Sequence, residues 1–159
     1  MSTANILANQ GTYLAIFDLL NRYTDAVNRR DWPELKNTFA HDAVWDMGGP
    51  AAGPMAMRFQ GAQQIADGIA AAISTSAMCV QANHALVVNV DGNRATARST
   101  IQEIVRPKDG GGLMILGTYH DDIILCEDGE WRFRERRFRI TYVDTSPLTG
   151  QTFAADSSV

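Results

Sequence analysis

The chain has 159 residues, of which 45% are hydrophobic, and this size suits one domain with a single buried core. Its formal net charge of -4 argues against a nucleic-acid partner, because phosphate backbones are bound by clustered Lys and Arg. The two cysteines, Cys79 and Cys126, cannot form a disulfide framework, and neither has the spacing of a metal site, so we expect reduced thiols and no metal.

The first helix is predicted from a repeat of apolar residues at the period of one helical face. This stripe consists of Ile16, Leu19, Leu20, Tyr23 and Val27, and it predicts a helix over about Asn5 to Arg29. Directly after it, Asp31 offers an N-cap and Pro33 stands in the first turn of a short second helix that runs through Leu35 and Phe39. The two helices are expected to form a hairpin.

A short strand is predicted over Ala43 to Met47, before a loop rich in Gly and Pro that is a plausible lid or pocket rim. A third amphipathic helix follows from Gly61 to about Ser74, because Ile65, Ile69 and Ile73 recur at a spacing of four.

The rest of the chain predicts a β-meander. Its strands span about 82–90, 94–106, 113–126 and 131–142, and the strongest turn signal is Asp128-Gly129 between two β-rich runs. The tail after Pro147 is either a loose end or an arm on a neighbouring molecule. Helices followed by strands, without βαβ alternation, indicate a single α+β domain over residues 1–159. Its helices pack on one curved antiparallel sheet and leave a cavity where the sheet bends away.

Taken together, these motifs resemble the nuclear transport factor 2-like superfamily, and specifically its SnoaL-like group, which includes relatives of ketosteroid isomerase and scytalone dehydratase. The residues that carry the resemblance are Arg22-Tyr23 through Asn28-Arg-Arg-Asp-Trp32, Phe39-Ala-His-Asp-Ala43, Phe59-Gln-Gly61, Val90-Asp-Gly-Asn-Arg-Ala95, Gly117-Thr-Tyr-His-Asp121 and Asp128-Gly-Glu-Trp-Arg-Phe133 with Arg137. The resemblance implies a cone-shaped, cystatin-like fold of three N-terminal helices on a curved antiparallel sheet, with the pocket between them. It does not fix a reaction, because the superfamily holds isomerases, dehydratases, cyclases and proteins without catalysis.

Tyr23 and Asp46 are the first candidates for catalysis. In ketosteroid isomerases a tyrosine five residues before an asparagine supplies the oxyanion hole, and Tyr23 and Asn28 repeat that spacing. Asp46 lies close to where those enzymes place the general base, and the adjacent Trp45 is a candidate for substrate binding. The alternatives are a tyrosine packed in the core and an aspartate that caps the loop.

Asp121 and Tyr119 share one face of a long strand, so Asp121 is expected to be buried there. As a protonated acid it could join Tyr23 in stabilising an enolate, as in the ketosteroid isomerase example. The alternative is an ion pair with Arg137 across the hairpin, and Arg137 is also a candidate to orient the substrate.

His84 and Glu103 are candidates because of their parity on two other strands. His84 has the parity of Leu86, Val88 and Val90, and it is either a proton shuttle or a hydrogen-bonded core residue. Glu103 has the parity of Ile101 and would line the pocket.

The chain departs from scytalone dehydratase and the related dehydrochlorinase at their catalytic pair. It has Asn28 at the position of their Asp, and Cys79 or Gln81 at the position of their His. Because an amide does not accept a proton at neutral pH, that dyad mechanism is doubtful here.

The sequence therefore predicts a cofactor-independent isomerase or dehydratase that moves a proton on a small apolar carbonyl or aromatic compound. Asp46 or His84 would be the base, Tyr23 and Asp121 the donors to oxyanion charge, and Asn28, Trp45, Glu103, Tyr119 and Arg137 the substrate contacts. The rival hypothesis is a non-catalytic ligand-binding or assembly module. Without an apolar stretch long enough to span a bilayer, we expect a soluble, cytoplasmic protein. A homodimer or homotrimer is expected because helices on one face of the sheet leave the other face to bury.

Overall fold

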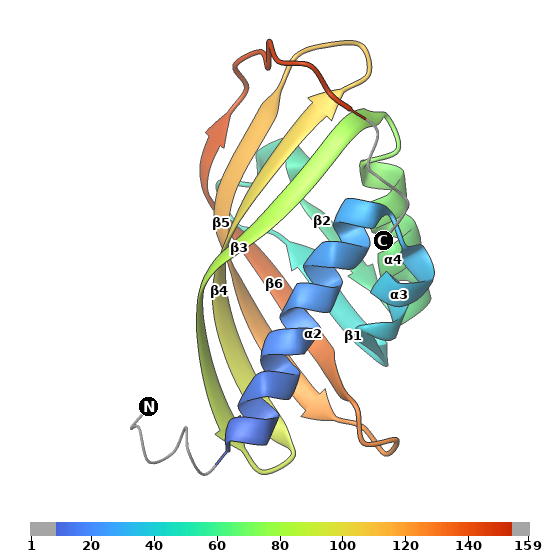
Figure 1. The fold of residues 1–159 in the computed structure, drawn as a ribbon, viewed down its shortest axis with the longest axis vertical. Helices are drawn as coiled ribbons and strands as arrows, with labels where there is room; N and C mark the ends of the chain where they lie inside the picture. Colours follow the sequence, from blue (N-terminus) through green and yellow to red (C-terminus); the bar gives the residue numbers. More distant parts are fainter. Residues whose placement is uncertain (1–8, 154–159) are drawn as a thin grey trace.

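A computed structural model describes residues 9–153 as three α-helices on one face of a curved six-stranded sheet (Figure 1). The helices are α2 (Gln10–Arg29), α3 (Trp32–Asn37) and α4 (Ala62–Ala72), and a short 3-10 turn, η1, spans Gly53–Met55. The strands are β1 (Phe39–Met47), β2 (Met57–Gln60), β3 (Ser76–Asp91), β4 (Arg94–Pro107), β5 (Leu113–Leu125) and β6 (Trp131–Asp144). The α+β fold predicted from the sequence is confirmed.

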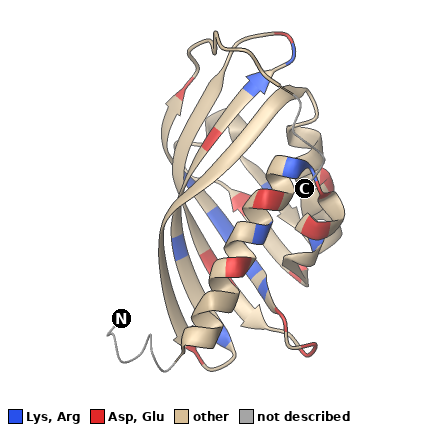
Figure 2. Ribbon diagram, viewed as in Figure 1, with Lys and Arg blue, Asp and Glu red and all other residues tan. Residues whose placement is uncertain are grey.

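Helix α2 buries the predicted apolar stripe against the sheet, with Ile16, Leu19, Leu20, Tyr23 and Val27 each at most 2% exposed. Its opposite side is charged, as Figure 2 shows, and an ion pair one turn apart joins Arg29 to Asp25 at 2.8 Å. The helix ends at Arg29, and the following Arg30 adopts the left-handed conformation, with φ 59°. The predicted start at Asn5 lies outside the described residues.

Helix α3 begins as the sequence predicts, because the Asp31 side chain accepts a hydrogen bond of 3.0 Å from the backbone N–H of Glu34. The prediction that it continues through Phe39 is wrong. The helix ends at Asn37, and Phe39 already pairs with Phe133 in the sheet.

The strand order is β2-β1-β6-β5-β4-β3, and β1 runs parallel to β6 while every other neighbouring pair is antiparallel. The sheet is therefore mixed, which corrects the prediction of a purely antiparallel one. After β1 and β2 the chain crosses through α4 to the far edge of the sheet and returns as the β3–β6 meander, so β6 arrives beside β1 in the same direction. Strand β2 escaped prediction because four residues are too few to show a period.

Two β-bulges change which side chains face the helices. In β3 three positions separate Asn83 from Leu86, whereas their partners Ile101 and Ser99 on β4 are two apart. In β6 Phe133 and Glu135 are two positions apart, whereas their partners on β5, Ile123 and Asp122, are adjacent. Each bulge inserts one extra residue, so the alternation of inward and outward side chains reverses beyond it.

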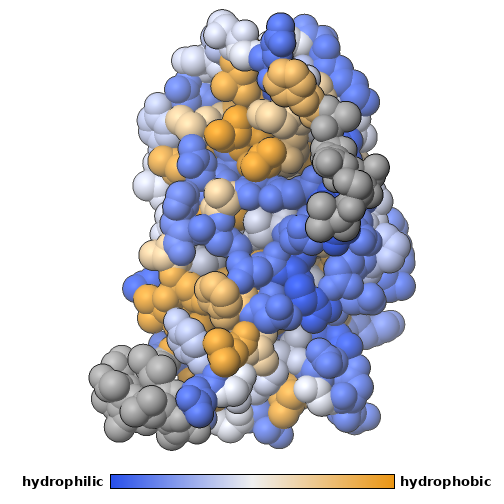
Figure 3. Space-filling model, in the orientation of Figure 1, coloured by the Kyte–Doolittle hydropathy of each residue, from blue (hydrophilic) through white to orange (hydrophobic). Residues whose placement is uncertain are grey.

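The outer surface has exposed apolar residues near the start of α2, where Leu14 is 64% and Phe17 48% exposed. Figure 3 shows an apolar area at that end of the molecule and a second one further up, with a hydrophilic band between them. No helix in the described range is long and apolar enough to cross a membrane. The predicted dimer or trimer stays a prediction.

Candidate functional site

A cavity of about 60 Å³ lies between the sheet and the helices. Its wall is mostly apolar and is built from α2, β1, β2, α4 and the inner face of β3–β6, by Tyr23, Val27, Trp45, Met47, Met57, Phe59, Ile69, Ala72, Ile73, Gln81, Ile101, Glu103, Tyr119 and Phe138. We infer that its mouth lies between β2 and the end of α4, because among the lining residues Ala72 is exposed and Met57 and Phe59 are half-buried. The loop rich in Gly and Pro was predicted to be a lid or pocket rim, but none of residues 48–56 lines the cavity, and the rim comes from β2 directly after that loop.

This volume holds a few water molecules and is smaller than the roughly 150 Å³ of an apolar cavity that accepts benzene. A ligand the size of a six-membered ring must therefore displace part of the wall. Met57 and Phe59 at the mouth are suited to this, because they are half-buried and methionine side chains adapt readily.

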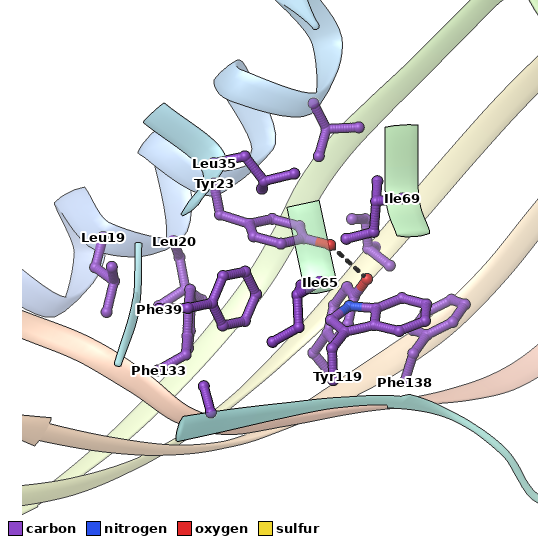
Figure 4. Close-up of a cluster of buried hydrophobic side chains, with 14 of the residues drawn as sticks. Leu19, Leu20, Tyr23, Leu35, Phe39, Ile65, Ile69, Tyr119, Phe133 and Phe138 are labelled. Atoms are coloured by element: carbon purple, nitrogen blue, oxygen red, sulfur yellow. Dashed lines mark hydrogen bonds between the residues drawn. The ribbon is translucent and has the colours of Figure 1, made fainter. Parts of the chain in front are cut away.

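Two tyrosine hydroxyls meet at the cavity, one from α2 and one from β5. The oxygens of Tyr23 and Tyr119 are 3.2 Å apart and hydrogen-bonded, and Figure 4 shows the two side chains pointing toward each other. Burial raises the pKa of Tyr23, although Arg136, the hydrogen bond with Tyr119 and the nearby Trp45 indole oppose this, and burial raises the pKa of Tyr119 well above its ordinary value. Both phenols stay protonated and can donate a hydrogen bond.

Glu103 supplies a titratable group to the same cavity. Its carboxylate accepts a hydrogen bond of 2.6 Å from the side-chain amide of Gln81, its neighbour on β3. Burial raises the pKa of Glu103, and the hydrogen bonds from Gln81 and Cys79 lower it only in part. Glu103 lines the same cavity as the hydroxyl pair, and its charge contributes to raising the pKa of both tyrosines.

Two further polar groups of the wall are buried and lack a hydrogen bond of standard geometry within residues 9–153. They are the Nε1 of Trp45 and the Oε1 of Gln81. The Trp45 indole lies near enough to the Tyr23 hydroxyl to lower the pKa of that group. Since buried polar groups are nearly always paired, one donor and one acceptor are left for a ligand or ordered water in the cavity.

Arg136 of β6 is a residue that the sequence analysis missed. It is 0% exposed, and its guanidinium lies 4.0 Å from the centre of the Tyr23 ring, 3.9 Å from that of Tyr119 and 4.3 Å from that of Phe133. The cation thus stacks on the rings whose hydroxyls reach the cavity. The apolar residues of β6 change from odd positions, Trp131 and Phe133, to even positions, Phe138 and Ile140. Arg136 has the parity of the second group, and this change was the signal in the sequence that Arg136 faces inward.

Asp121 is buried as predicted, but its partner is Arg136 and not Arg137. The Arg136 Nε lies 3.6 Å from an Asp121 oxygen, and both side chains are fully buried. Burial raises the pKa of Asp121 to about 6, opposed by Arg136 and Arg137. Arg137 lies beyond the bulge on the outer face, opposite His120, with 44% of its side chain exposed. The prediction that Arg137 contacts substrate is therefore wrong, and Asp121 lies behind the tyrosine rings with Arg136 and away from the cavity wall.

Asp46 lies on the opposite face of β1 from the cavity residues Trp45 and Met47. Arg139 donates to its Oδ2 at 2.5 Å, and Arg58 lies 3.7 Å from its Oδ1. This ion-paired carboxylate does not reach the cavity, which contradicts its predicted role as the general base.

His84 is exposed, and the bulge in β3 is the reason. Leu86, Val88 and Val90 do face the helices, but the extra residue between Asn83 and Leu86 turns His84 outward. The prediction of a buried His84 that shuttles protons is wrong.

Asn28 joins α2 to the edge of the sheet. Its Nδ2 donates to the carbonyl of Gln81 at 3.0 Å, and its Oδ1 accepts from the N–H of Gln81 at 2.7 Å. Its amide is thus committed to the β3 backbone. Cys79, the other candidate for the missing dyad, is buried, and burial followed by the nearby Glu103 raises its pKa to about 12. A thiolate at neutral pH is not expected there.

The structure therefore brings Tyr23, Trp45, Glu103 and Tyr119 together and leaves Asp46, His84 and Arg137 outside. Within the described range, no group of three His, Cys, Asp or Glu side chains is arranged to hold a metal ion.

Known proteins similar to this chain share its fold. Residues 11–137 match the model of the SnoaL-like domain. A hexachlorocyclohexane dehydrochlorinase of the LinA type from Novosphingobium barchaimii superposes with a TM-score of 0.74 at 18% identity, covering 98% of this chain and 100% of that one. A candidate scytalone dehydratase from Novosphingobium aromaticivorans gives 0.74 at 18% identity over 91% and 97%.

A candidate aromatic ring hydroxylase from Novosphingobium aromaticivorans also gives a TM-score of 0.74, at 21% identity over 84% of this chain and 92% of that one. No curated protein sequence matches this chain significantly. At these identities the structural likeness establishes the fold and leaves the reaction open.

Proposed function

This chain belongs to the SnoaL-like family, whose fold encloses a pocket for small molecules, and we propose that it moves a proton on a small, uncharged carbonyl or aromatic compound without a cofactor. One observation carries the proposal: Glu103 and the Tyr23–Tyr119 hydroxyl pair reach the same apolar cavity. An acid whose pKa is raised above its ordinary value is better suited to take up and return a proton on a bound molecule. The general base is thus Glu103, in place of Asp46 or His84.

The proposed step is a proton transfer next to a carbonyl group. The Glu103 carboxylate takes the proton from the α-carbon, the C–H electron pair forms a C=C bond, and the carbonyl π pair moves to the oxygen. Hydrogen bonds from the tyrosine hydroxyls stabilise the resulting enolate, and Glu103 returns the proton to the same or another carbon. A return to the same carbon exchanges hydrogen, and a return to another carbon isomerises the substrate.

The polar groups of the cavity also favour a particular kind of ligand. An oxygen acceptor near Tyr23 would pair with the unpartnered N–H of Trp45, and a donor near Glu103 would pair with the Oε1 of Gln81. The cation next to the site, Arg136, lies behind the tyrosine rings, so it offers a carboxylate or phosphate no direct contact in the cavity. A neutral compound with a carbonyl and a hydroxyl or N–H group fits best.

The test is hydrogen–deuterium exchange at the α-carbon of 1-indanone in D2O, followed by proton NMR. The protein should accelerate exchange, and Glu103→Gln should lower the catalysed rate by about 100-fold or more. Tyr119→Phe should lower it by about tenfold, since it removes one oxyanion donor. Asp46→Asn and His84→Ala, which change outward-facing groups, are matched controls that should keep the wild-type rate.

The commitment of Asn28 to the β3 backbone favours the rival function, a non-catalytic ligand-binding module, because the family's dehydratase acid is missing. The same experiment separates the two. If 1-indanone saturates the protein in a binding titration but its α-protons exchange at the buffer rate, the catalytic proposal fails and the binding module stands.

A further inference from the structure

Phe59, an aromatic residue of the cavity mouth, lies directly on a glycine of the neighbouring helix. A Cβ added to Gly68 of α4 would be 2.5 Å from the Cε1 and Cζ atoms of the Phe59 ring, which is far inside van der Waals contact. The opposite wall repeats the arrangement, because a Cβ on Gly117 would be 2.5 Å from the ring of Phe138. Both rings line the cavity.

Backbone conformation does not explain either glycine. Gly68 is in the interior of α4, and neither Gly68 nor Gly117 is among the described glycines with positive φ, in contrast to Gly92 and Gly129 in the hairpin turns. A glycine inside a helix is destabilising relative to alanine, because its backbone loses more conformational freedom on folding. The other small residues of α4 are alanines. The Phe59 ring, which fills the space that a Cβ would need, therefore explains why position 68 is a glycine.

The two rings differ in how easily they can move. Phe138 is buried and packs on Tyr119 with ring centres 4.8 Å apart. Phe59 is half-buried at the mouth and stacks on Trp45 at 5.9 Å with an interplanar angle of 22°. The atoms that a methyl group on Gly68 would meet are the far end of a side chain. That side chain can shift without breaking the sheet, whereas a Cβ on Gly117 would also meet the backbone oxygen of Arg139 at 2.7 Å.

We propose that Gly68 is a specificity-determining residue, which holds the Phe59 ring withdrawn against α4 and so sets the largest ligand that the cavity admits. The inference rests on the proposed function only in taking the cavity to be the ligand site, and it needs no catalysis. A methyl group at position 68 should push the tip of the Phe59 ring into the mouth, where the volume is already small.

The experiment compares wild type, Gly68→Ala, Phe59→Leu and the double variant by calorimetric titration with phenol and with 2-naphthol. Gly68→Ala should weaken the binding of phenol by about tenfold, because the displaced ring takes space that the ligand needs in an already small cavity. Phe59→Leu should favour 2-naphthol over phenol relative to wild type. Adding Phe59→Leu to Gly68→Ala should restore phenol binding.

Gly11→Ala in α2 is the matched control, because nothing lies within 4 Å of a Cβ at that position. It should leave binding of both probes unchanged. Binding of both probes within twofold of wild type by Gly68→Ala, or tighter binding of 2-naphthol, would overturn the proposal.

A crystal structure of Gly68→Ala supplies a readout that needs no ligand. We expect α4 to keep its place and the Phe59 ring to move toward Trp45. A ring that stays in place while α4 moves away would overturn the inference even if the protein binds neither probe. Absence of probe binding by wild type, with the ring displaced in the variant, would instead count against the proposed function alone.

Discussion

Two acids on the inner face of the sheet, the buried Asp121 on β5 and the half-buried Glu103 on β4, differ in what surrounds them. Asp121 is closed in with the guanidinium of Arg136, under the rings of Tyr23 and Tyr119. Glu103 has neutral hydrogen-bond partners and faces the cavity. Burial raises the pKa of both, and in Asp121 a cation opposes the rise.

These surroundings indicate a structural role for Asp121 and a chemical role for Glu103. An acid held beside a buried cation and outside the cavity wall serves packing and the electrostatics of its neighbours. An acid with neutral partners and an adjoining cavity is free to exchange a proton with a bound molecule. Burial and a raised pKa alone would not tell the two apart. The Tyr23–Tyr119 pair links the two regions, because Arg136 lies on the ring faces while the hydroxyls point to the cavity.

The largest expected effect comes from removing one partner of the buried Asp121–Arg136 ion pair. Arg136→Met should lower the free energy of unfolding by about 3–5 kcal/mol, because it leaves Asp121 as an unpaired buried acid and removes three ring contacts. Urea denaturation at pH 7 measures it. Arg137→Met, next in sequence but exposed on the outer face, is the control and should change the free energy by less than about 0.5 kcal/mol.

Both partners of the Asp121–Arg136 ion pair can then be replaced together. Adding Asp121→Leu to Arg136→Met should recover most of the lost stability, since a buried ion pair can often be replaced by packed apolar side chains. Equal losses for Arg136→Met and Arg137→Met would show that the buried pair does not have the assigned importance.

The second effect is a dependence of stability on pH in which both acids act in the same direction. Their folded pKa values are raised, so the native state binds more protons than the unfolded state once the pH exceeds the ordinary value. Stability is then fully present below that value and falls as pH rises through the folded pKa. For Asp121 the window runs from about 4 to about 6, and the loss is about 3 kcal/mol.

Asp128 and Asp144 act in the opposite direction at lower pH. Hydrogen bonds from Arg132 and Ser146, respectively, lower their pKa values, so their stabilising contribution is lost only as pH falls below the ordinary range. The protein should therefore be most stable in mildly acidic solution, near pH 4–5, as measured by urea midpoints between pH 3 and pH 8.

Glu103→Gln isolates the contribution of Glu103, the acid of the cavity, to the pH dependence of stability. The amide keeps the shape of the acid but does not ionise, so the stability of the variant relative to wild type should increase as pH rises. Glu130→Gln, at an exposed position of the hairpin turn, gives the same change of charge without burial. A difference between Glu103→Gln and wild type that stays constant from pH 4 to pH 8 would contradict a raised pKa at Glu103.

The sequence predicted the elements whose signal is periodic or lies in a turn. The stripe of α2 placed Tyr23 on the buried face, and the Asp128-Gly129 turn fixed the last hairpin, where Gly129 has φ 85°. Strand β4 keeps its alternation past Ile101, so Glu103 was correctly expected to line the pocket, and Tyr119 on β5 was placed by the same rule.

The wrong placements share a cause, because a single inserted residue reverses the alternation of a strand. His84 lies within one such bulge, and Arg137 follows another. In β6 the apolar residues on either side of the bulge change parity, so Arg136 could have been found. In β3 the buried apolar residue before the bulge, Cys79, has an odd number and Val88 after it has an even one, but a single residue on the first side was too little to reveal the change. Asp46 is a different error, since Trp45 and Met47 already marked the other face of β1 as buried.

The smallest expected effect tests whether the bulge in β3 turns His84 outward. It thereby also tests the choice of Glu103 over His84 as the proposed base. His84→Ala should change the free energy of unfolding by less than about 0.5 kcal/mol, because an exposed side chain loses little on truncation. Gln81→Ala, three residues earlier and facing the cavity, should cost about 1–3 kcal/mol, since it removes the donor to Glu103. Urea denaturation of both variants measures the contrast, and a His84→Ala loss as large as that of Gln81→Ala would place His84 inside and reopen it as the base.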